Sequence, residues 1–305
     1  MAYLRFRIAF GIIAILFTVR TDALTEEELW SYDRTAYNGP DNWKLMFPSC
    51  EGDNQSPINI DIEQTRMSSE LGPLVFHNFE KPFVNSVLCN SEYTANLLLD
   101  RPDPVEVEGG NLEGTFQFHK LLFHWDSTTS NEGSEHAINL LHYPLEMQLV
   151  AFNTKYQNIT EALTYGDGIV AFAVLFKLRE SAKDPASLKI IVENFENISI
   201  PGSSAKLTSP IYFQDLIPTD TTRYFRYRGS LTTPPCSEGV IWTIFEETVP
   251  INSNLLIKFN TLKDSNGNPF QQCHRPVQPL KNRPVLKSPR NLTVQTTTFE
   301  NKVEV

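Results

Sequence analysis

The pattern of apolar and polar residues along the chain is that of a protein built mainly from β-strands. Four stretches either alternate apolar and polar residues or run continuously apolar over the length of a strand. They are residues 116–124, 145–152, 169–178 and 240–249. Over residues 74–99, shorter apolar runs alternate with Asn, Ser and Pro, as expected for strands joined by turns.

Helical patterns are few. The best covers residues 185–195, where Asp184 can cap the first turn and one face carries Leu188, Ile191, Val192 and Phe195. Strands dominate, and no repeat or linker divides the chain. We therefore predict a mainly β (α+β) fold: a single domain with a large twisted, mostly antiparallel central sheet and short peripheral helices. With 305 residues, 41% of them hydrophobic, the chain can bury one large core.

The two ends of the chain depart from this pattern. Residues 1–23 carry Arg5 and Arg7, then an apolar run over residues 8–17, and end in a small residue, which is typical of a secretory signal peptide. The run is short for a membrane span, and a retained anchor is the alternative. Residues 288–305 are polar and threonine-rich and predict a disordered tail. We expect a folded domain over residues 24–287 in a secreted, extracellular protein without a membrane span.

The charge balance narrows the classes of partner. The chain has 26 basic and 36 acidic residues, and loss of the leader, with three basic residues and one acidic residue, would leave 23 against 35, a net charge of −12. A chain so acidic is a poor general ligand for nucleic acid, heparin-like chains or anionic membranes. We expect no nucleic-acid partner.

Several short motifs occur in a fixed order. They are Gly-Gly-Asn-Leu-Glu-Gly at residues 109–114, Phe-His-Trp at 123–125, Gly-Ser-Glu-His at 133–136, Tyr-Pro-Leu-Glu at 143–146, Ser-Leu-Thr-Thr-Pro-Pro at 230–235 and Arg-Pro-Val-Gln-Pro-Leu at 275–280. Together they resemble the alpha-class carbonic anhydrases, over about residues 31–287. The resemblance implies the fold of that family and, in an intact member, a zinc ion held by a His-x-His pair on one strand and a third histidine on the next.

Counting outward from these motifs aligns the three zinc ligands with Leu122, His124 and Gln148. A catalytic zinc needs about three nitrogen, sulfur or carboxylate ligands and one open position for the water that it acidifies. Leucine donates nothing, and a glutamine amide is a weak ligand for zinc. The resemblance therefore implies a degraded zinc site, with no cofactor and no metal expected.

An alternative register must be weighed, because Gln-Phe-His at residues 117–119 looks like the start of the ligand strand. If residues 120–122 were an insertion, His119 would become the first ligand. The spacing of the motifs needs no insertion, and His119 has the opposite strand parity to His124. A bulge could reverse that parity. The alternative would still leave Gln148 in place of the third histidine.

Other positions of the family's active site are present. Glu135 and Thr232 match the pair that orients the zinc-bound nucleophile, and Thr233 lies beside them. As a buried pair they can also serve as a satisfied structural bond. Tyr93 aligns with the family's proton-shuttle histidine. We expect no catalytic residue here and regard these four side chains as vestigial.

Two further positions have changed surroundings. Glu146 matches the carboxylate that orients the third zinc histidine, and with Gln148 in that place it must find another donor or titrate upward. Lys120 could supply positive charge where the metal would sit. His136 and His142 read as core or surface histidines rather than ligands.

Four cysteines suit an oxidising compartment. Cys50 and Cys236 match the disulfide of the family's secreted members. Cys89 and Cys273 have no assigned partner and can form a second bridge, remain free thiols or link two chains. Sequons for N-glycosylation occur at four positions, of which the first, beside a packed segment, is the least expected to be used: Asn54, Asn158, Asn197 and Asn291.

The sequence thus predicts a secreted, catalytically inactive carbonic anhydrase-related protein that acts as a binding or recognition module. Its partner would be an extracellular protein or glycan, and the chain a monomer or a disulfide-linked dimer. The alternative is a working, zinc-dependent carbonic anhydrase that converts carbon dioxide and water to bicarbonate and a proton. That enzyme would need a metal site rebuilt from His124, His119 and Gln148 or Glu146. An extracellular storage or matrix protein is a third possibility.

Overall fold

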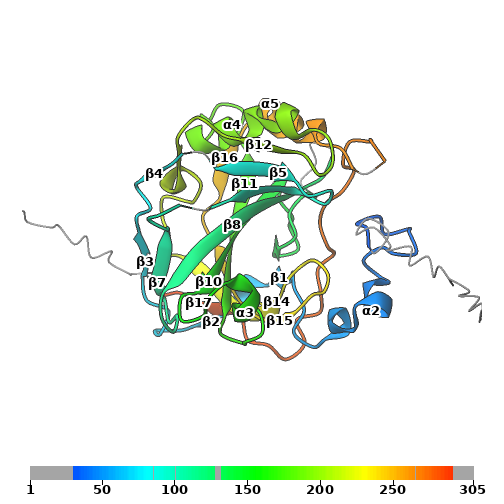
Figure 1. The fold of residues 1–305 in the computed structure, drawn as a ribbon. Helices are drawn as coiled ribbons and strands as arrows, with labels where there is room; N and C mark the ends of the chain where they lie inside the picture. The colour runs from blue at the N-terminus through cyan, green and yellow to red at the C-terminus, as the bar shows by residue number, and fades with distance from the viewer. Residues whose placement is uncertain (1–29, 85, 100, 128–131, 265, 291–305) are drawn as a thin grey trace, which may run out of the picture.

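The computed structural model describes residues 30–84, 86–99, 101–127, 132–264 and 266–290. These residues form one large mixed sheet surrounded by short helices (Figure 1). The predicted signal peptide, residues 1–23, and residues 291–305 of the predicted tail lie outside the described residues. Within the described ranges, no helix combines the length and the apolar character that a membrane crossing requires.

The elements follow one another in chain order. The strands are β1 (Asn59–Ile60), β2 (Arg66–Met67), β3 (Leu74–His77), β4 (Pro82–Phe83), β5 (Val87–Asn90), β6 (Ala95–Leu98), β7 (Glu106–Gly109), β8 (Phe116–Trp125), β9 (Ala137–Ile138), β10 (Leu145–Asn153), β11 (Ile169–Leu178), β12 (Ser204–Lys206), β13 (Ile211–Tyr212), β14 (Tyr224–Ser230), β15 (Glu238–Phe245), β16 (Val249–Ile251) and β17 (Leu286–Lys287). The α-helices are α2 (Trp43–Met46), α3 (Ile159–Ala162), α4 (Ala186–Glu193) and α5 (Ser253–Leu256). Short 3-10 helices are η1 (Pro48–Glu51), η2 (Ile62–Gln64), η3 (Phe195–Ile198), η4 (Phe213–Asp215) and η5 (Ile257–Thr261).

The large sheet has the strand order β12-β5-β6-β8-β10-β11-β15-β14-β17-β2, with β7 beside β8, β3 beside β7 and β16 beside β11. Its strand pairs are antiparallel except where β11 meets β15 and β16, and where β17 meets β2. The predicted fold class, a mostly antiparallel sheet with peripheral helices, is confirmed. In Figure 1, α4 and α5 lie together at one end of the molecule and α2 lies at another.

The centre of the sheet is buried on both faces. Every residue of β10 is buried, with Leu149 and Ala151 in one apolar cluster and Val150 and Phe152 in the other. Full burial of a Leu or Phe side chain contributes about 1.5–3 kcal/mol. Two apolar layers therefore hold β10 rigidly, and the side chains that it positions belong to the candidate site.

The longest strands lie where the apolar pattern predicts them, with one correction. Residues 169–178 form β11, and residues 116–124 and 145–152 fall within β8 and β10. Residues 240–249, predicted as one strand, are divided between β15 and β16. Ile244 pairs with Ala173 and Val249 with Phe176, so five residues of one segment span three of β11. The two extra residues interrupt the strand at the half-exposed Glu246 and Glu247.

The predicted helix is also present, with a different start. α4 covers Ala186–Glu193 and buries Leu188, Ile191 and Val192, whereas Phe195 begins η3. Asp184 does not cap α4, because its carboxylate instead accepts hydrogen bonds from the backbone and side chain of Asn252.

At the other end of the chain, Ser288 is the first residue of the predicted tail, but it is buried. Its backbone N–H donates to Tyr224 O at 3.0 Å and its hydroxyl donates to Thr222 O at 2.8 Å. The folded part thus continues past residue 287, because Ser288 supplies bonds to β14.

Candidate functional site

The pairing of β8 with β10 brings the aligned ligand positions together. Leu122 lies opposite Gln148, and His124 lies opposite Glu146. Because residues two apart on a strand face the same side, all four side chains project from one face of the sheet. On that face Leu122 packs against the apolar cluster that includes Trp242 and offers no donor atom.

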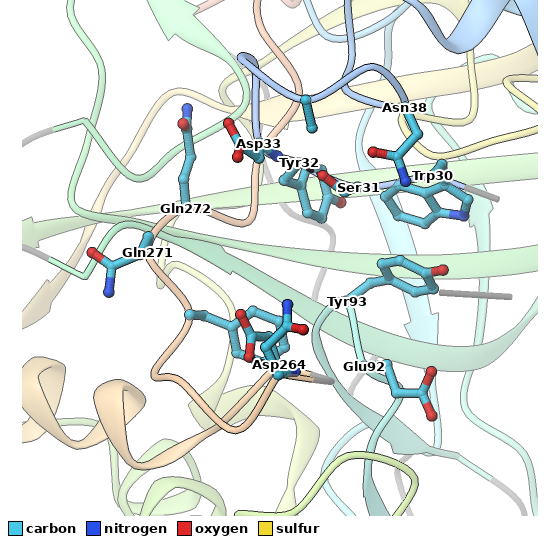
Figure 2. Close-up of a pocket in the computed structure, with 13 residues that line it drawn as sticks. Trp30, Ser31, Tyr32, Asp33, Asn38, Glu92, Tyr93, Asp264, Gln271 and Gln272 are labelled. Carbon is cyan, nitrogen blue, oxygen red and sulfur yellow. Dashed lines mark hydrogen bonds between the residues drawn. The ribbon is translucent and has the colours of Figure 1, made fainter. Parts of the chain in front are cut away.

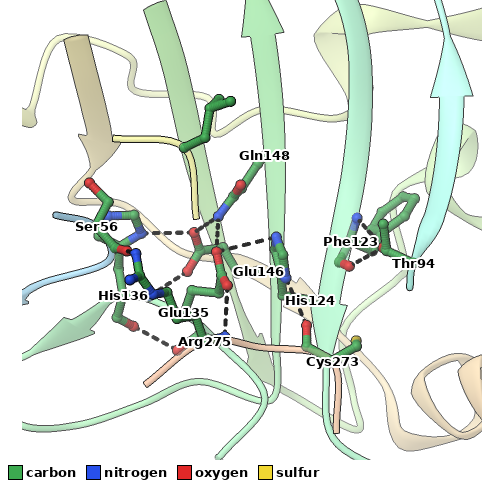
Figure 3. A network of polar contacts seen from close by, with 12 residues as sticks. Ser56, Thr94, Phe123, His124, Glu135, His136, Glu146, Gln148, Cys273 and Arg275 are labelled. Carbon is green, nitrogen blue, oxygen red and sulfur yellow. Dashed lines mark hydrogen bonds and ion pairs between the residues drawn. The ribbon is translucent and has the colours of Figure 1, made fainter. Parts of the chain in front are cut away.

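His124 is fully buried and its ring is fixed at both nitrogens. Its Nδ1 lies 2.7 Å from Cys273 O. Because a carbonyl oxygen only accepts, Nδ1 carries a hydrogen and donates it. Nε2 lies 3.3 Å from Glu135 Oε2, within ion-pair distance but without the orientation of a hydrogen bond. The imidazole ring of His124 is therefore turned toward the carboxylate of Glu135 (Figure 3).

Gln148 replaces a ring by an amide that joins two carboxylates. Its Nε2 donates to Glu135 Oε2 at 2.7 Å and to Glu146 Oε1 at 2.9 Å. Both amide hydrogens are used, and the opposite orientation of the amide would place oxygen against oxygen. Gln148 thus separates and satisfies two buried acids (Figure 3).

Glu146 has found another donor, as one of the two sequence expectations allowed. His136 approaches it with the backbone N–H at 2.7 Å and with Nδ1 at 2.8 Å, and His136 Nε2 lies 2.8 Å from the hydroxyl of Tyr227. Burial alone would raise the pKa of Glu146, but the charge and hydrogen bonds of His136 outweigh it and lower that pKa to about 2. Of the two outcomes that the sequence left open, Glu146 thus shows the first, a new donor.

Glu135 is held by a different set of donors. The backbone N–H of Arg275 donates to Oε1 at 2.8 Å, and the Thr232 hydroxyl also hydrogen-bonds to this carboxylate. Burial raises the pKa of Glu135, and the charge of His124 opposes that rise. Thr233 is half-buried beside Thr232, and its carbonyl accepts from the backbone N–H of Cys236 at 2.8 Å. The threonine and glutamate thus form a satisfied buried pair.

These residues do not fit a zinc ion. The position of the first ligand carries the hydrocarbon side chain of Leu122, and the Gln148 nitrogen is committed to two carboxylates. Of the three aligned positions, only His124 carries a good zinc ligand, and its Nε2 faces Glu135. Across the described ranges, no three or more His, Cys, Asp or Glu side chains are grouped so that they could hold a metal ion.

β8 contains the bulge that the alternative register required. Val150 pairs with Lys120 and Ala151 with Phe118, so His119 is the extra residue. The ring centroids of His119 and Phe152 are 6.4 Å apart. Because a bulge interrupts the strict alternation of side chains along β8, the argument from strand parity against His119 fails. Phe152 is four residues along β10 from Gln148, or about 13 Å at the rise of a strand. His119 thus lies well away from the third ligand position.

Lys120 does not compensate the two carboxylates. It is largely buried, and burial lowers its pKa while nearby Cys89 acts in the opposite direction. The groups that stabilise Glu135 and Glu146 are instead His124, His136, Arg275, Thr232 and Gln148. The proposed electrostatic role of Lys120 is therefore not what the geometry shows.

Tyr93 lies at the margin of this site. Its ring stacks on that of Trp30, with a centroid separation of 3.7 Å and an interplanar angle of 10°. Both rings line a pocket formed with the N-terminal segment of the described chain (Figure 2). Tyr93 therefore belongs to an aromatic stack at a pocket wall.

The disulfide that the resemblance implied is present. Cys50 and Cys236 form a disulfide across a sequence separation of 186 residues. Cys89 and Cys273 are free thiols, so the second bridge is not formed. Cys273 is buried against Trp125, whose backbone N–H lies 3.2 Å from the sulfur. Burial raises the pKa of both thiols.

The sequons differ in how freely their amides are presented. Asn54 Nδ2 donates to Glu238 Oε2 at 3.0 Å, which occupies the nitrogen that a glycan would use. Asn158 is exposed and caps α3 through its oxygen. Asn197 is exposed as well, and its Nδ2 donates to Asn194 Oδ1 at 3.0 Å. Asn291 lies outside the described residues.

Sequence reasoning did not identify two bonding partners of the buried acids. His136, expected to be a core or surface histidine, is a buried core histidine and is the principal partner of Glu146. Arg275 bonds Glu135 through its backbone and Gln55, Ser56 and Cys50 through its guanidinium. The available signal was position: His136 directly follows Glu135, and Arg275 begins the motif at residues 275–280.

Comparison with known proteins identifies the family that this chain resembles. The family described as "Eukaryotic-type carbonic anhydrase" matches residues 38–289. Carbonic anhydrase 15 of Mus musculus is 35% identical over 272 residues, which cover 85% of this chain and 83% of that protein. Carbonic anhydrase 3 of Homo sapiens is 29% identical over 263 residues, covering 85% of this chain and 98% of that protein.

A further relative is a much larger protein. Receptor-type tyrosine-protein phosphatase zeta of Rattus norvegicus is 35% identical over 239 residues. The match covers 77% of this chain but only 10% of that protein. The same kind of domain therefore also occurs as a small part of a longer chain.

Proposed function

Because the chain belongs to the eukaryotic-type carbonic anhydrase family, we propose that it is a secreted, catalytically inactive member that acts as a binding or recognition module. The observation that carries the proposal is the Gln148 amide. It occupies the third ligand position and donates both hydrogens to Glu135 and Glu146. With Leu122 at the first position, the chain offers the metal one imidazole where the chemistry needs about three good ligands.

The role in recognition rests on what the chain retains. The sheet, both apolar layers and the Cys50–Cys236 disulfide maintain a rigid domain, and a fold can serve binding after its chemistry is lost. A receptor-type relative carries a similar domain as a tenth of its length. That relative is a receptor-type protein, which supports a recognition role for a domain of this kind.

The test compares the natural chain with the double variant Leu122→His and Gln148→His. Both proteins are measured for zinc per molecule and for the rate of carbon dioxide hydration. We expect the natural chain to retain no stoichiometric zinc and to hydrate carbon dioxide at the buffer rate. The variant should gain zinc, since its new ring at position 148 can donate to Glu146 as the amide now does.

The result that overturns the proposal is stoichiometric zinc in the natural chain together with zinc-dependent hydration. That outcome would favour the alternative, a working carbonic anhydrase. The recognition role has its own measurement: labelled protein should bind intact cells or extracellular matrix saturably, and unlabelled protein should compete. Adsorption that never saturates would count against it.

A further inference from the structure

A pocket of about 550 Å³ opens beside the N-terminal segment of the described chain, and neither Glu135 nor Glu146 lines it (Figure 2). Three parts of the chain that are far apart in sequence form it: residues 30–38, residues 92–93, and residue 264 with residues 266–272. A volume of this size is in the range of ligand sites, about 300–1,000 Å³. Its lining consists of Trp30, Ser31, Tyr32, Asp33, Ala36, Asn38, Glu92, Tyr93, Asp264, Asn266, Phe270, Gln271 and Gln272.

The charge of this lining has one sign. Asp33, Glu92 and Asp264 contribute carboxylates, and among the described residues that line the pocket none is Lys, Arg or His. Hydrogen bonds from the Thr35 hydroxyl and backbone lower the pKa of Asp33, so it is ionised at neutral pH. Such a wall repels phosphate, sulfate and carboxylate groups and attracts cations.

The carboxylates are held in place by their own loops. Asp33 Oδ1 accepts from the backbone N–H and the hydroxyl of Thr35, at 2.8 and 2.7 Å. Asp264 Oδ1 accepts from the backbone N–H groups of Asn266 and Asn268, both at 2.9 Å. Each carboxylate thus has one oxygen fixed by its turn, and in each the second oxygen can accept from a ligand.

The aromatic residues give the pocket a second property. Trp30, Tyr32, Tyr93 and Phe270 form its walls, and aromatic faces attract cations through their quadrupole. Tyr32 is 5% exposed, and its hydroxyl oxygen is shielded from water with no hydrogen-bond partner among the residues that the structure describes. Because that oxygen is inaccessible, the hydroxyl is not a hydrogen-bonding group that the pocket presents to a ligand.

Accepting the recognition role proposed above, we propose that this pocket binds the guanidinium or ammonium group of a basic side chain from a partner protein. The fixed carboxylates accept the hydrogen bonds of the cation, and the aromatic walls cover the apolar stem of the side chain. The amides of Asn38, Gln271 and Gln272 can contact the partner's backbone. A flat guanidinium can hydrogen-bond one carboxylate through two N–H groups and stack on an aromatic face, which suits these walls better than a compact ammonium does.

The experiment titrates the whole protein with acetyl-Gly-Gly-Arg-Gly-Gly-amide and with the same peptide in which citrulline, the uncharged analogue, replaces arginine. Binding is followed by calorimetry and by the NMR signal of the Trp30 indole N–H. We expect the arginine peptide to bind at least about tenfold more tightly than the citrulline peptide. Free agmatine forms a third arm and should bind more weakly than the peptide, which distinguishes a protein side chain from a small amine.

Variants locate the interaction. Asp33→Asn with Asp264→Asn retains the oxygen that each loop needs and removes both charges, and it should weaken the arginine peptide at least about fivefold. The matched control, Glu63→Gln with Asp103→Asn, makes the same change in net charge at exposed positions outside the pocket. It should leave the affinity within about twofold.

Equal affinity for the arginine and citrulline peptides, an unchanged affinity in the pocket variant, or no binding of the arginine peptide would each overturn the proposal. Tighter binding of agmatine than of the peptide would replace a protein partner by a small amine. Carbon dioxide hydration by the natural chain is measured in parallel. Activity there would refute the proposed inactivity while leaving the peptide result to stand or fall separately.

Discussion

At the scale of single residues, hydrogen bonds stabilise the two carboxylates buried in the site. Glu135 and Glu146 remain buried, and two buried acids without donors would be costly. The Gln148 amide supplies one hydrogen to each, and His136 and Arg275 supply others. The Gln148 amide is therefore coupled to the stability of the fold.

The first prediction follows from this coupling. Gln148→Leu preserves the size of the side chain but removes a donor from each carboxylate, so the free energy of unfolding should fall by about 3 kcal/mol. Urea denaturation followed by circular dichroism measures the change. The control is Leu122→Met in the opposite position of β8, which conserves volume and should cost less than about 1.5 kcal/mol. Equal losses in the two variants would show that packing, not the amide, is what position 148 provides.

A second prediction concerns His274, which is 8% exposed. Burial, with help from the charges of His124 and His142, lowers the pKa of His274 to about 4. Between about pH 6.5 and pH 4 the unfolded chain therefore binds a proton at this residue that the folded chain does not. Stability from this group is full above about pH 6.5 and is lost as the pH falls toward 4.

His274→Gln removes that titration. The dependence of the unfolding free energy on pH should flatten over this window, by up to about 3 kcal/mol in total. The exposed His77 provides the control, and His77→Gln should keep the slope of the natural chain. Denaturation at half-unit steps from pH 4 to pH 7.5 gives the comparison. If the two variants have the same slope, His274 is not the group that the folded state keeps neutral.

At the scale of elements, one covalent link joins the start of the domain to its last long strands. Cys50 lies in η1 and Cys236 lies between β14 and β15. A cross-link over 186 residues restricts the unfolded chain, and the chain-entropy relation gives a stabilisation of about 5 kcal/mol.

We therefore expect Cys50→Ala with Cys236→Ala to lose up to about 5 kcal/mol of unfolding free energy. Equilibrium denaturation without reductant measures it. Cys89→Ala, which removes a half-buried free thiol, should cost much less. A loss below about 1 kcal/mol in the double variant would mean that the unfolded chain is already compact around this link.

The sequence predicts those elements whose local apolar pattern directly reflects how they are buried in the fold. β11 is apolar over most of its length because it is buried on both faces, and its limits are those predicted. Two-residue strands such as β1 and β17 have no pattern of their own, and only pairing with distant segments creates them. The bulge at His119 and the two extra residues after Phe245 depend on register between strands, which a single strand's sequence does not contain.

The sequence predicted which residues lie in the site but not which hydrogen bonds they form. Counting from the motifs placed Leu122, His124 and Gln148, and these do lie on one face. The partner of Glu146 could not be derived, because His136 reaches it through a turn whose shape the sequence does not give. The pocket at Trp30 was also missed, since three segments more than fifty residues apart in sequence form it.

At the scale of the whole molecule, the described surface offers little for self-association through the sheet. The edge strands of the described sheet are β12, β2, β3 and β16, which are two to four residues long, and β12 and β2 carry Lys206 and Arg66. Short, charged edge strands disfavour pairing with a second sheet. Cys273 is buried and unavailable to another chain, which leaves Cys89, half-buried on β5, as the thiol that a disulfide-linked dimer would need.

The last prediction is that the protein is a monomer and that Cys89 remains reduced. Burial raises the pKa of the Cys89 thiol, so little reactive thiolate forms at neutral pH. Sedimentation without reductant should give the mass of one chain, unchanged by Cys89→Ala. A thiol reagent should label Cys89 slowly in the folded protein and Cys273 only after denaturation. Dimers that disappear in Cys89→Ala would refute the monomer, and larger assemblies that persist in the variant would instead favour a storage or matrix role.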